Sequence, residues 1–316
     1  MATAFVFPGQ GSQAIGMGKA LGDNHAAARA VFAEVDDALG QKLSDLMWNG
    51  LEADLTLTEN AQPALMAVSM AALRVLETEH GIKLDEYAKF VAGHSLGEYS
   101  ALAAAGTFSI ADTARLLKIR GKAMQAATPV GVGAMAALLG LDFATASLVA
   151  AEAAQGEVCQ AANDNSDGQV VISGSKAAID RALEIAKARG AKRAILLAVS
   201  APFHCALMQP AADAMARALS EVKMHPPSVA LVANVLASPT SDPVMIRQKL
   251  VEQVTGTVRW RESVAYMVAQ GVKVFVEIGA GKVLTGLAKK NAPEALAVAC
   301  GTPEDIAAVA AHLKQG

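Results

Sequence analysis

Aromatic residues are scarce in this chain of 316 residues, where Phe, Trp and Tyr together account for 4% of the sequence. The hydrophobic fraction still reaches 53%, and alanine and valine dominate it. Small apolar side chains allow helices to pack closely on a sheet. We therefore expect a large core, built as one large domain or as two modest ones.

Cysteine is also rare. The three thiols, Cys159, Cys205 and Cys300, are far apart in the sequence. Their spacing matches neither a disulfide framework nor a zinc site, which excludes a small disulfide-rich secreted fold. This favours a reducing compartment, and we expect a cytoplasmic protein with no bound metal or cofactor.

A basic excess and long apolar runs are missing as well. Lys and Arg number 27 against 30 Asp and Glu, so the net charge is −3, which argues against a nucleic-acid or membrane-surface protein. No uncharged apolar run approaches the roughly 18 residues that a membrane-spanning helix needs. The first residues lack the basic segment of a signal peptide, so we expect none.

The sequence does contain a serine between two glycines, in the pattern Gly93-x-Ser95-x-Gly97. An apolar run at 90–92 precedes it, and an alanine-rich helical pattern at 99–105 follows it. Strand, sharp turn and helix in this order are typical of a nucleophile elbow, in which a strained turn exposes the serine hydroxyl. The helix would then direct free N–H groups at a developing oxyanion. An ordinary turn with a capping serine is the alternative.

A glycine-rich loop at 9–18 follows a short apolar strand pattern at 4–7. Its spacing partly matches a dinucleotide fingerprint, but Pro8 enters the turn and no later strand ends in an acid at the expected distance. We therefore expect a ligand-facing loop, with the amides of Gln10 and Gln13 as candidate hydrogen-bond donors. A solvated loop is the alternative.

Residues 131–198 differ in character from the chain on either side, and their predicted order of elements is βαββαβ, that of a ferredoxin-like unit. We therefore predict an α/β fold. In it, residues 1–130 and 199–316 form a hydrolase-like core with a mostly parallel sheet, and residues 131–198 form an inserted ferredoxin-like subdomain. Within the insert we expect strands at 133–139, 158–162, 169–173 and 193–199, a polar turn at 163–168, and helices at 142–154 and, capped by Ser175, 176–189.

Turn and capping residues divide the remaining chain. Asn24 and Ser109 are expected to cap helices that reach about Leu39 and Ala127. Another helix is expected to start between Thr58 and Pro63, and its apolar residues recur at helical spacing over 64–79. Further helices are expected at 205–222, 244–254, 260–270 and 303–314, with another after the glycines at 279–281, and strands at 228–232, 272–278 and 295–299.

A serine hydroxyl needs a base to remove its proton, and this chain has six histidines. His204 stands where a strand-end loop meets a helix, the edge at which ligands bind in α/β folds. From position alone it is as good a candidate for the base as for a structural histidine. The adjacent Cys205 is interpreted as a buried core cysteine, because neighbouring helical residues do not face each other. Of the other histidines, His25 and His80 are expected to be solvated, His225 to lie in a loop before two prolines, and His94 to support the turn.

Arg120 precedes Gly121 in the helix after the elbow. Its guanidinium could hold a carboxylate through two parallel hydrogen bonds or could form a surface ion pair, and the sequence alone favours neither. Met124 lies one turn further on the same face, as a core residue or as a pocket wall.

Motifs along nearly the whole chain resemble those of the malonyl-CoA–acyl carrier protein transacylases and the related acyltransferase domains of polyketide synthases. That family has a hydrolase-like α/β core with a ferredoxin-like insert, in agreement with the predicted order of elements. The motifs that carry the resemblance are Phe7-Pro8-Gly9-Gln10-Gly11-Ser12-Gln13, Gln62-Pro63-Ala64, Gly93-His94-Ser95-Leu96-Gly97-Glu98-Tyr99-Ser100, Arg120-Gly121, Gly133-Ala134-Met135, Asn165-Ser166, Gln169-Val170-Val171-Ile172-Ser173-Gly174, Pro202-Phe203-His204 and Glu277-Ile278-Gly279-x-Gly281.

By this resemblance Ser95 is the nucleophile and His204 is its base. A backbone carbonyl near Gln253 would take the place of the usual carboxylate. By accepting the Nδ1 proton, this carbonyl would leave Nε2 of the histidine free to face the serine.

The resemblance also implies that the amides of Gln10 and Leu96 form an oxyanion hole and that Arg120 binds the free carboxylate of malonate. Phe203 resembles the malonyl-selecting form of its motif, although some family members carry serine there. Further substrate contacts are implied for Gln62, Met124 and Asn165.

The implied reaction moves a malonyl group from malonyl-CoA to the phosphopantetheine thiol of acyl carrier protein, through a malonyl-serine ester. We expect a monomer that serves fatty acid synthesis and binds neither nucleic acid nor membrane. An acyltransferase of a polyketide pathway, a serine esterase or thioesterase with the same dyad, and a carrier-binding scaffold are the alternatives. An acidic carrier would need a local basic patch, for which the candidates are Lys187, Arg189, Lys192, Arg193, Lys289 and Lys290.

Overall fold

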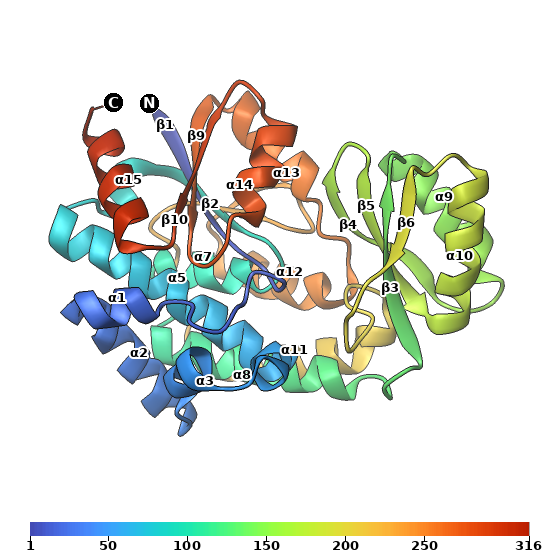
Figure 1. Cartoon of the computed structure of the whole chain (residues 1–316), viewed down its shortest axis with the longest axis horizontal. Coiled ribbons are helices and arrows are strands. Elements are labelled where there is room, and N and C mark those ends of the chain that lie inside the picture. The colour runs from blue at the N-terminus through green and yellow to red at the C-terminus, as the bar shows by residue number, and fades with distance from the viewer. Residues whose placement is uncertain (316) are drawn as a thin grey trace.

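Two sheets organise the chain, and this computed structural model describes residues 1–315 of it (Figure 1). The larger sheet contains β1 (Ala2–Phe7), β2 (Ala88–Gly93), β7 (Leu231–Ala233), β8 (Ser238–Thr240), β9 (Val272–Ile278) and β10 (Leu296–Cys300). Its order is β10-β9-β1-β2-β7-β8, and all neighbours pair in parallel except β8, which runs antiparallel to β7. The carboxyl ends of β1 and β2 therefore lie at the same edge.

Helices cover both faces of this sheet, as the continuously apolar sequences of its strands require. Phe5 and Phe7 of β1 pack into one apolar cluster, whereas Ala4 and Val6 point the opposite way into a second. The helices of this part are α1 (Lys19–Asn24), α2 (Ala26–Leu39), α3 (Leu43–Asn49), α4 (Glu52–Thr56), α5 (Thr58–His80), α6 (Leu84–Tyr87), α7 (Gly97–Ala104), α8 (Ile110–Ala126), α11 (Gln209–Glu221), α12 (Pro243–Thr255), α13 (Trp260–Ala269), α14 (Val283–Asn291) and α15 (Pro303–Gln315), with a 3₁₀ turn at Ala206–Met208.

The smaller sheet stands beside the larger unit, with its two helices on the outer side (Figure 1). Its elements are β3 (Gly133–Leu139), α9 (Phe143–Ala154), β4 (Cys159–Ser166), β5 (Gln169–Ser175), α10 (Lys176–Ala188) and β6 (Arg193–Leu196). The strands pair antiparallel in the order β4-β5-β3-β6. This is the ferredoxin-like arrangement, so the predicted fold class, a mostly parallel sheet with an additional ferredoxin-like unit, is confirmed.

The polar run at 163–168 was expected to be a turn, and this prediction is wrong for its first residues. Strand β4 continues to Ser166, and only Asp167 and Gly168 form the turn. Asn163 bridges to Val258, and the buried Asp164 carboxylate forms an ion pair with Arg261 of α13 at 2.8 Å. Polar side chains stay in this strand because their partners lie on the larger unit.

The predicted cap at Asn24 is also wrong. Asn24 is the last residue of α1, and its side-chain amide donates to the carbonyl of Ala20 at 2.8 Å. His25 occupies the position before α2. In contrast, Ser109 caps α8 as predicted, since its hydroxyl accepts the N–H of Asp112 at 3.0 Å.

Several other boundaries differ from the prediction. Helix α5 begins at Thr58, the first residue of the predicted range for its start, and includes Pro63. Ser175 precedes α10 without a side-chain capping hydrogen bond. Strands β6 and β7 are shorter than expected, the chain from 205 begins with a 3₁₀ turn, and α1, α3, α4, α6 and β8 were not expected. Among the described residues, no helix is both long enough and apolar enough to cross a membrane.

Candidate active site

Ser95 occupies a sharp turn between β2 and α7, at the carboxyl edge of the larger sheet. Its φ of 54° lies in the left-handed region, which few residues other than glycine adopt. The flanking glycines make this turn possible. A Cβ atom on Gly93 would lie 1.9 Å from the backbone of Gly97, and one on Gly97 would lie 2.2 Å from the carbonyl oxygen of Phe7. The predicted strand–turn–helix arrangement is therefore confirmed.

Both peptide groups of the serine are held by distant side chains. The N–H of Ser95 donates to Oδ1 of Asn234 at 2.9 Å. The carbonyl oxygen of Ser95 accepts a hydrogen bond from Nε2 of Gln253 at 2.9 Å. The Asn234 amide also donates to the carbonyl of Gly93 at 2.7 Å. These bonds stabilise a backbone conformation that costs of the order of 1–3 kcal/mol.

His204 meets the serine from the loop that follows β6. Its Nε2 lies 2.8 Å from Oγ of Ser95, and its Nδ1 lies 2.7 Å from the backbone carbonyl of Gln253. A carbonyl can only accept, so Nδ1 carries the proton and Nε2 is free to accept the serine proton. Burial, together with the nearby charge of Arg120, lowers the pKa of His204 to about 3. The imidazole is therefore neutral near pH 7.

Arg120 reaches the same serine from α8. Its Nη2 donates to Oγ of Ser95 at 3.1 Å and to Oε1 of Gln253 at 2.8 Å, while Nη1 donates to Oε1 of Gln62 at 2.7 Å. The residue is 1% exposed, and within residues 1–315 its guanidinium makes no ion pair. The surface ion pair that the sequence left open is thus absent. Burial lowers the pKa of this guanidinium, as expected for a cation without a partner anion.

A cavity of about 380 Å³ opens in front of these three side chains. Gln62 contributes to its wall and is itself held by Thr58 and by the sulfur of Met124. Phe203 is 9% exposed. The sequence-predicted residues that line this cavity are Gln10, Gln13, Gln62, Ser95, Leu96, Arg120, Met124, Asn165, Phe203 and His204.

Gln10 and Leu96 both line this cavity, and the backbone N–H of each has no hydrogen-bond partner among the described residues. The side chain of Gln10 accepts the hydroxyl of Thr58 at 2.7 Å, and the side chain of Gln13 accepts the N–H of Gly11 at 2.7 Å. Within residues 1–315, the backbone N–H groups of both glutamines of the glycine-rich loop therefore remain without a protein partner.

Asn165 contacts His94, the residue that precedes Ser95 in the turn. Its Oδ1 lies 2.8 Å from Nε2 of His94, and its backbone carbonyl accepts the side chain of Asn291 at 2.8 Å. His94 also packs against Trp260, and burial lowers its pKa. His94 therefore supports the turn, as expected, and Asn165 connects the smaller sheet to it.

Sequence reasoning missed three residues around the dyad. Asn234 lies in a loop with no distinguishing motif, and Glu98 and Tyr99 lie inside the serine motif but were assigned no role. Tyr99 has its ring 5.6 Å from the guanidinium carbon of Arg120. Cys205 is fully buried and donates to the carbonyl of Pro202, which agrees with its interpretation as a core cysteine.

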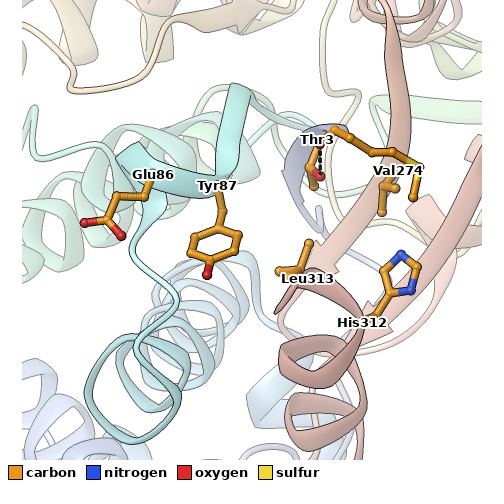
Figure 2. A pocket seen from close by; sticks show the side chains of 7 residues that line it. Thr3, Glu86, Tyr87, Val274, His312 and Leu313 are labelled. Atoms are coloured by element: carbon orange, nitrogen blue, oxygen red, sulfur yellow. Dashed lines mark hydrogen bonds between the residues drawn. The ribbon is translucent and has the colours of Figure 1, made fainter. Parts of the chain in front are cut away.

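A second cavity, of about 240 Å³, lies at the opposite edge of the larger sheet. Figure 2 shows Tyr87 and His312 on two sides of it, with Thr3 and Leu313 between them. No serine or cysteine lines it. Nucleophile, base and cation therefore come together in the first cavity.

Comparison with known proteins agrees with this geometry. Residues 4–307 match the acyl transferase domain family. The chain is 47% identical over 305 residues to the malonyl CoA-acyl carrier protein transacylase of Escherichia coli O157:H7, covering 96% of this chain and 97% of the relative.

Two solved structures are similar along almost their whole length. The acyl-carrier-protein S-malonyltransferase of Bartonella henselae is 58% identical with a TM-score of 0.97, covering 99% of this chain and 100% of that one. A malonyl-transacylase solved in complex with its type II polyketide acyl-carrier protein is 43% identical with a TM-score of 0.95, covering 99% of this chain and 100% of that one.

Proposed function

The chain belongs to the malonyl CoA-acyl carrier protein transacylase family, and we propose that it transfers malonyl groups from malonyl-CoA to the thiol of an acyl carrier protein. The observation that carries this proposal is Arg120, a buried and unpaired cation 3.1 Å from the Ser95 hydroxyl. A buried charge without a partner is costly. A substrate that supplies a carboxylate beside the reacting carbonyl removes that cost.

The first half-reaction acylates the serine. His204 removes the proton of Ser95 as Oγ attacks the thioester carbonyl, and the amides of Gln10 and Leu96 bind the oxyanion. Collapse of this intermediate breaks the carbon–sulfur bond, and the protonated imidazole returns its proton to the departing CoA thiolate. A malonyl-serine ester remains.

The second half-reaction repeats these steps with a different thiol. The phosphopantetheine thiol of the carrier gives its proton to His204 and attacks the ester, and Ser95 leaves with that proton. CoA and the carrier present the same pantetheine arm, so one cavity can serve both halves. No metal or bound cofactor takes part in this scheme.

Arg120 provides the selectivity for malonyl over acyl groups that lack a free carboxylate. Without substrate, its Nη2 donates to the serine oxygen. In the ester, the malonyl carboxylate would accept hydrogen bonds from the guanidinium of Arg120. The remaining N–H groups of that guanidinium would still donate to Gln62 and Gln253. Met124 and Phe203 line the cavity and would contact the malonyl group. Asn165 would act through His94 rather than on the substrate directly.

A basic rim at the cavity mouth suits an acidic carrier. Arg193, Leu139 and Gln169 lie in one row across the smaller sheet, and Lys290 donates to the Gln169 side chain at 3.0 Å. Gln169 also lines the cavity. A carrier bound at Arg193 and Lys290 could therefore extend its pantetheine arm directly inward.

The six basic candidates are not equivalent. Lys187 and Arg189 already form ion pairs with Glu184 and Glu152, which reduces the charge that they can offer a partner. We therefore assign docking to Lys192, Arg193 and Lys290, which form no ion pair among the described residues, whereas Lys289 lines a different cavity beside β10 and α15.

Other properties complete the proposal. We propose that residues 131–198 form an inserted subdomain, which is supported by their separate sheet and apolar cluster. We also propose a monomer that works in the cytoplasm, where the three free cysteines would stay reduced. Fatty acid synthesis is the proposed pathway, with polyketide synthesis as the alternative because one similar structure contains a polyketide carrier.

The decisive experiment is intact mass spectrometry after incubation with malonyl-CoA. We expect one malonyl adduct, absent from Ser95→Ala and discharged by holo carrier protein. Hydrolysis faster than transfer would favour a serine esterase, and the absence of an adduct would favour a scaffold. Presenting fatty-acid and polyketide carriers to the acylated enzyme distinguishes the two pathways.

A further inference from the structure

One side-chain amide connects the arginine to the serine turn. Gln253 is fully buried, and its Oε1 accepts Nη2 of Arg120 at 2.8 Å. Its Nε2 lies 2.9 Å from the carbonyl oxygen of Ser95, 3.1 Å from Oδ1 of Asn234 and 2.5 Å from Oε2 of Glu98, and these three acceptors share its two protons. A guanidinium has donors only, so the reversed amide would put N–H groups against Arg120. The orientation of this amide therefore decides whether Arg120 is held.

Glu98 is the strongest acceptor on the Nε2 side of this amide. It lies in the first turn of α7, 1% exposed, and its Oε2 accepts Nε2 of Gln253 at 2.5 Å. Its Oε1 accepts the N–H of Asn234 at 3.4 Å, a longer contact. A carboxyl group presents an acceptor to Gln253 and thereby disfavours the reversed amide, in which Oε1 would face it.

We propose that Glu98 is a positioning residue for Arg120: its carboxyl group orients the Gln253 amide, which in turn directs the guanidinium toward Ser95. This inference rests on the proposed role of Arg120 in binding the malonyl carboxylate. Glu98 itself has no hydrogen bond to Arg120 or to the serine hydroxyl, so it acts through Gln253.

The environment of Glu98 suits this task. Burial raises its pKa to about 8, so the group is mostly protonated near pH 7. A protonated carboxyl keeps its carbonyl oxygen as an acceptor for Gln253, and its hydroxyl oxygen can still accept, more weakly, the N–H of Asn234. It adds little negative charge beside Arg120, which leaves the cation available for a substrate carboxylate.

The test compares acyl groups that differ by one carboxylate. Glu98→Gln has nearly the shape of the protonated carboxyl, but its NH₂ group cannot accept a hydrogen bond as a hydroxyl oxygen can, so Gln253 and Asn234 compete for the one remaining acceptor oxygen. Single-turnover acylation is followed by intact mass with malonyl-CoA and with acetyl-CoA, and a fluorophosphonate reports the reactivity of the serine. We expect the malonyl-to-acetyl rate ratio to fall about tenfold, the effect of one lost buried hydrogen bond. Fluorophosphonate labelling should stay within about threefold of the unmodified protein, because the dyad is untouched.

Glu277→Gln is the matched control. Glu277 is another buried glutamate, and it accepts the N–H groups of Leu284 and Thr285 at the start of α14. This variant should lower thermal stability without changing the malonyl-to-acetyl ratio. An equal change of ratio in both variants would overturn the proposal, because loss of any buried carboxylate would then have the same effect.

Arg120→Ala separates this inference from the proposed function. If Arg120→Ala lowers the ratio and Glu98→Gln does not, the Glu98 inference fails and the role of Arg120 stands. If Arg120→Ala leaves the ratio unchanged, both fail. In the double variant, Glu98→Gln should add nothing to the effect of Arg120→Ala, as expected for two residues that act in series.

Two further outcomes are decisive. Equal losses in malonyl transfer, acetyl transfer and labelling would mean that Glu98 supports the serine turn alone, and would overturn the proposal. If Glu98→Gln does not fold, Glu98→Asp keeps the carboxyl group but shortens its reach. It should lower the ratio by a smaller factor with labelling retained, and an unchanged ratio in Glu98→Asp would also overturn the proposal.

Discussion

Ser95 and His204 both adopt left-handed backbone conformations, with φ of 54° and 60°, and their side chains meet at 2.8 Å. Two non-glycine residues in this region store strain that the surrounding structure must hold. Gln253 contributes at both positions, through its side chain to the Ser95 carbonyl and through its own carbonyl to His204. The backbone conformations of Ser95 and His204 therefore place the two side chains in contact before any substrate binds.

The first prediction concerns Arg120. Arg120→Ala should lower malonyl transfer by about 30-fold to several thousand-fold, because truncating one member of a buried charge pair costs about 2–5 kcal/mol. Arg120→Lys should recover only part of this loss, since an ammonium group cannot reproduce the two-pronged contact. Steady-state rates with malonyl-CoA and acetyl-CoA measure the effect. Equal losses with both substrates would make Arg120 a structural residue.

The second prediction concerns pH. His204 has its pKa lowered to about 3, so it stays neutral down to about pH 4. Fluorophosphonate labelling of Ser95 should therefore be nearly flat from pH 8 to pH 5, whereas a histidine with an ordinary pKa would lose about 30-fold at pH 5. The lowered pKa of His204 makes the folded state less stable as the pH falls below about 6.5, whereas the raised pKa of Glu98 makes it more stable as the pH falls from about 8 to 4.5, so the two contributions oppose each other between pH 6.5 and 4.5. A labelling rate that falls with a midpoint near pH 6.5 would contradict this prediction.

The third prediction concerns the glycine before the serine turn. Gly93→Ala should destabilise the protein by more than about 3 kcal/mol and abolish acylation, because the added Cβ would lie 1.9 Å from the Gly97 backbone. Gly286→Ala in α14 is the matched control. Apart from its chain neighbours and the backbone of its own helix, no atom lies within 4 Å of the added Cβ, so helix propensity should stabilise the protein by up to about 1 kcal/mol. Urea unfolding measures both, and similar effects at the two sites would refute the steric explanation.

The fourth prediction concerns carrier docking. Charge reversal at Arg193 and Lys290 should raise the KM for carrier protein by about 3- to 10-fold and leave the KM for malonyl-CoA unchanged, because charges at an interface rim act mainly on association. Lys83→Glu is the control, since Lys83 precedes α6 far from the cavity and pairs with Glu86. The effect should also weaken with added salt. Equal changes in both KM values would exclude this docking surface.

Much of this architecture was predictable because its signals are local. The glycine spacing around Ser95 requires a tight turn, and alternating apolar patterns identified the βαββαβ order between residues 133 and 196. Ser109 was recognisable as a cap because its partner, Asp112, lies three residues away. Such features depend on neighbours in the sequence.

The remainder depends on distant partners. The strand residues 163–165 look like a turn until Val258, Arg261 and His94 are placed beside them. Asn234 has no motif, yet it holds the Ser95 N–H across 139 positions of sequence. Whether Arg120 was buried or exposed could not be decided from its own helix, because its enclosure comes from Gln62 on α5 and Gln253 on α12.

The bond between Asn165 and His94 has a consequence for making chimaeras. Hairpin β4–β5 belongs to the smaller sheet. Its polar residues form hydrogen bonds with the loop before Ser95 and with the end of α14, and an ion pair with the start of α13. If residues 131–198 were exchanged for those of a relative, each of these contacts would join a residue of the relative to a residue of this chain. A functional graft must carry matching residues at His94, Val258, Arg261 and Asn291 along with the exchanged segment.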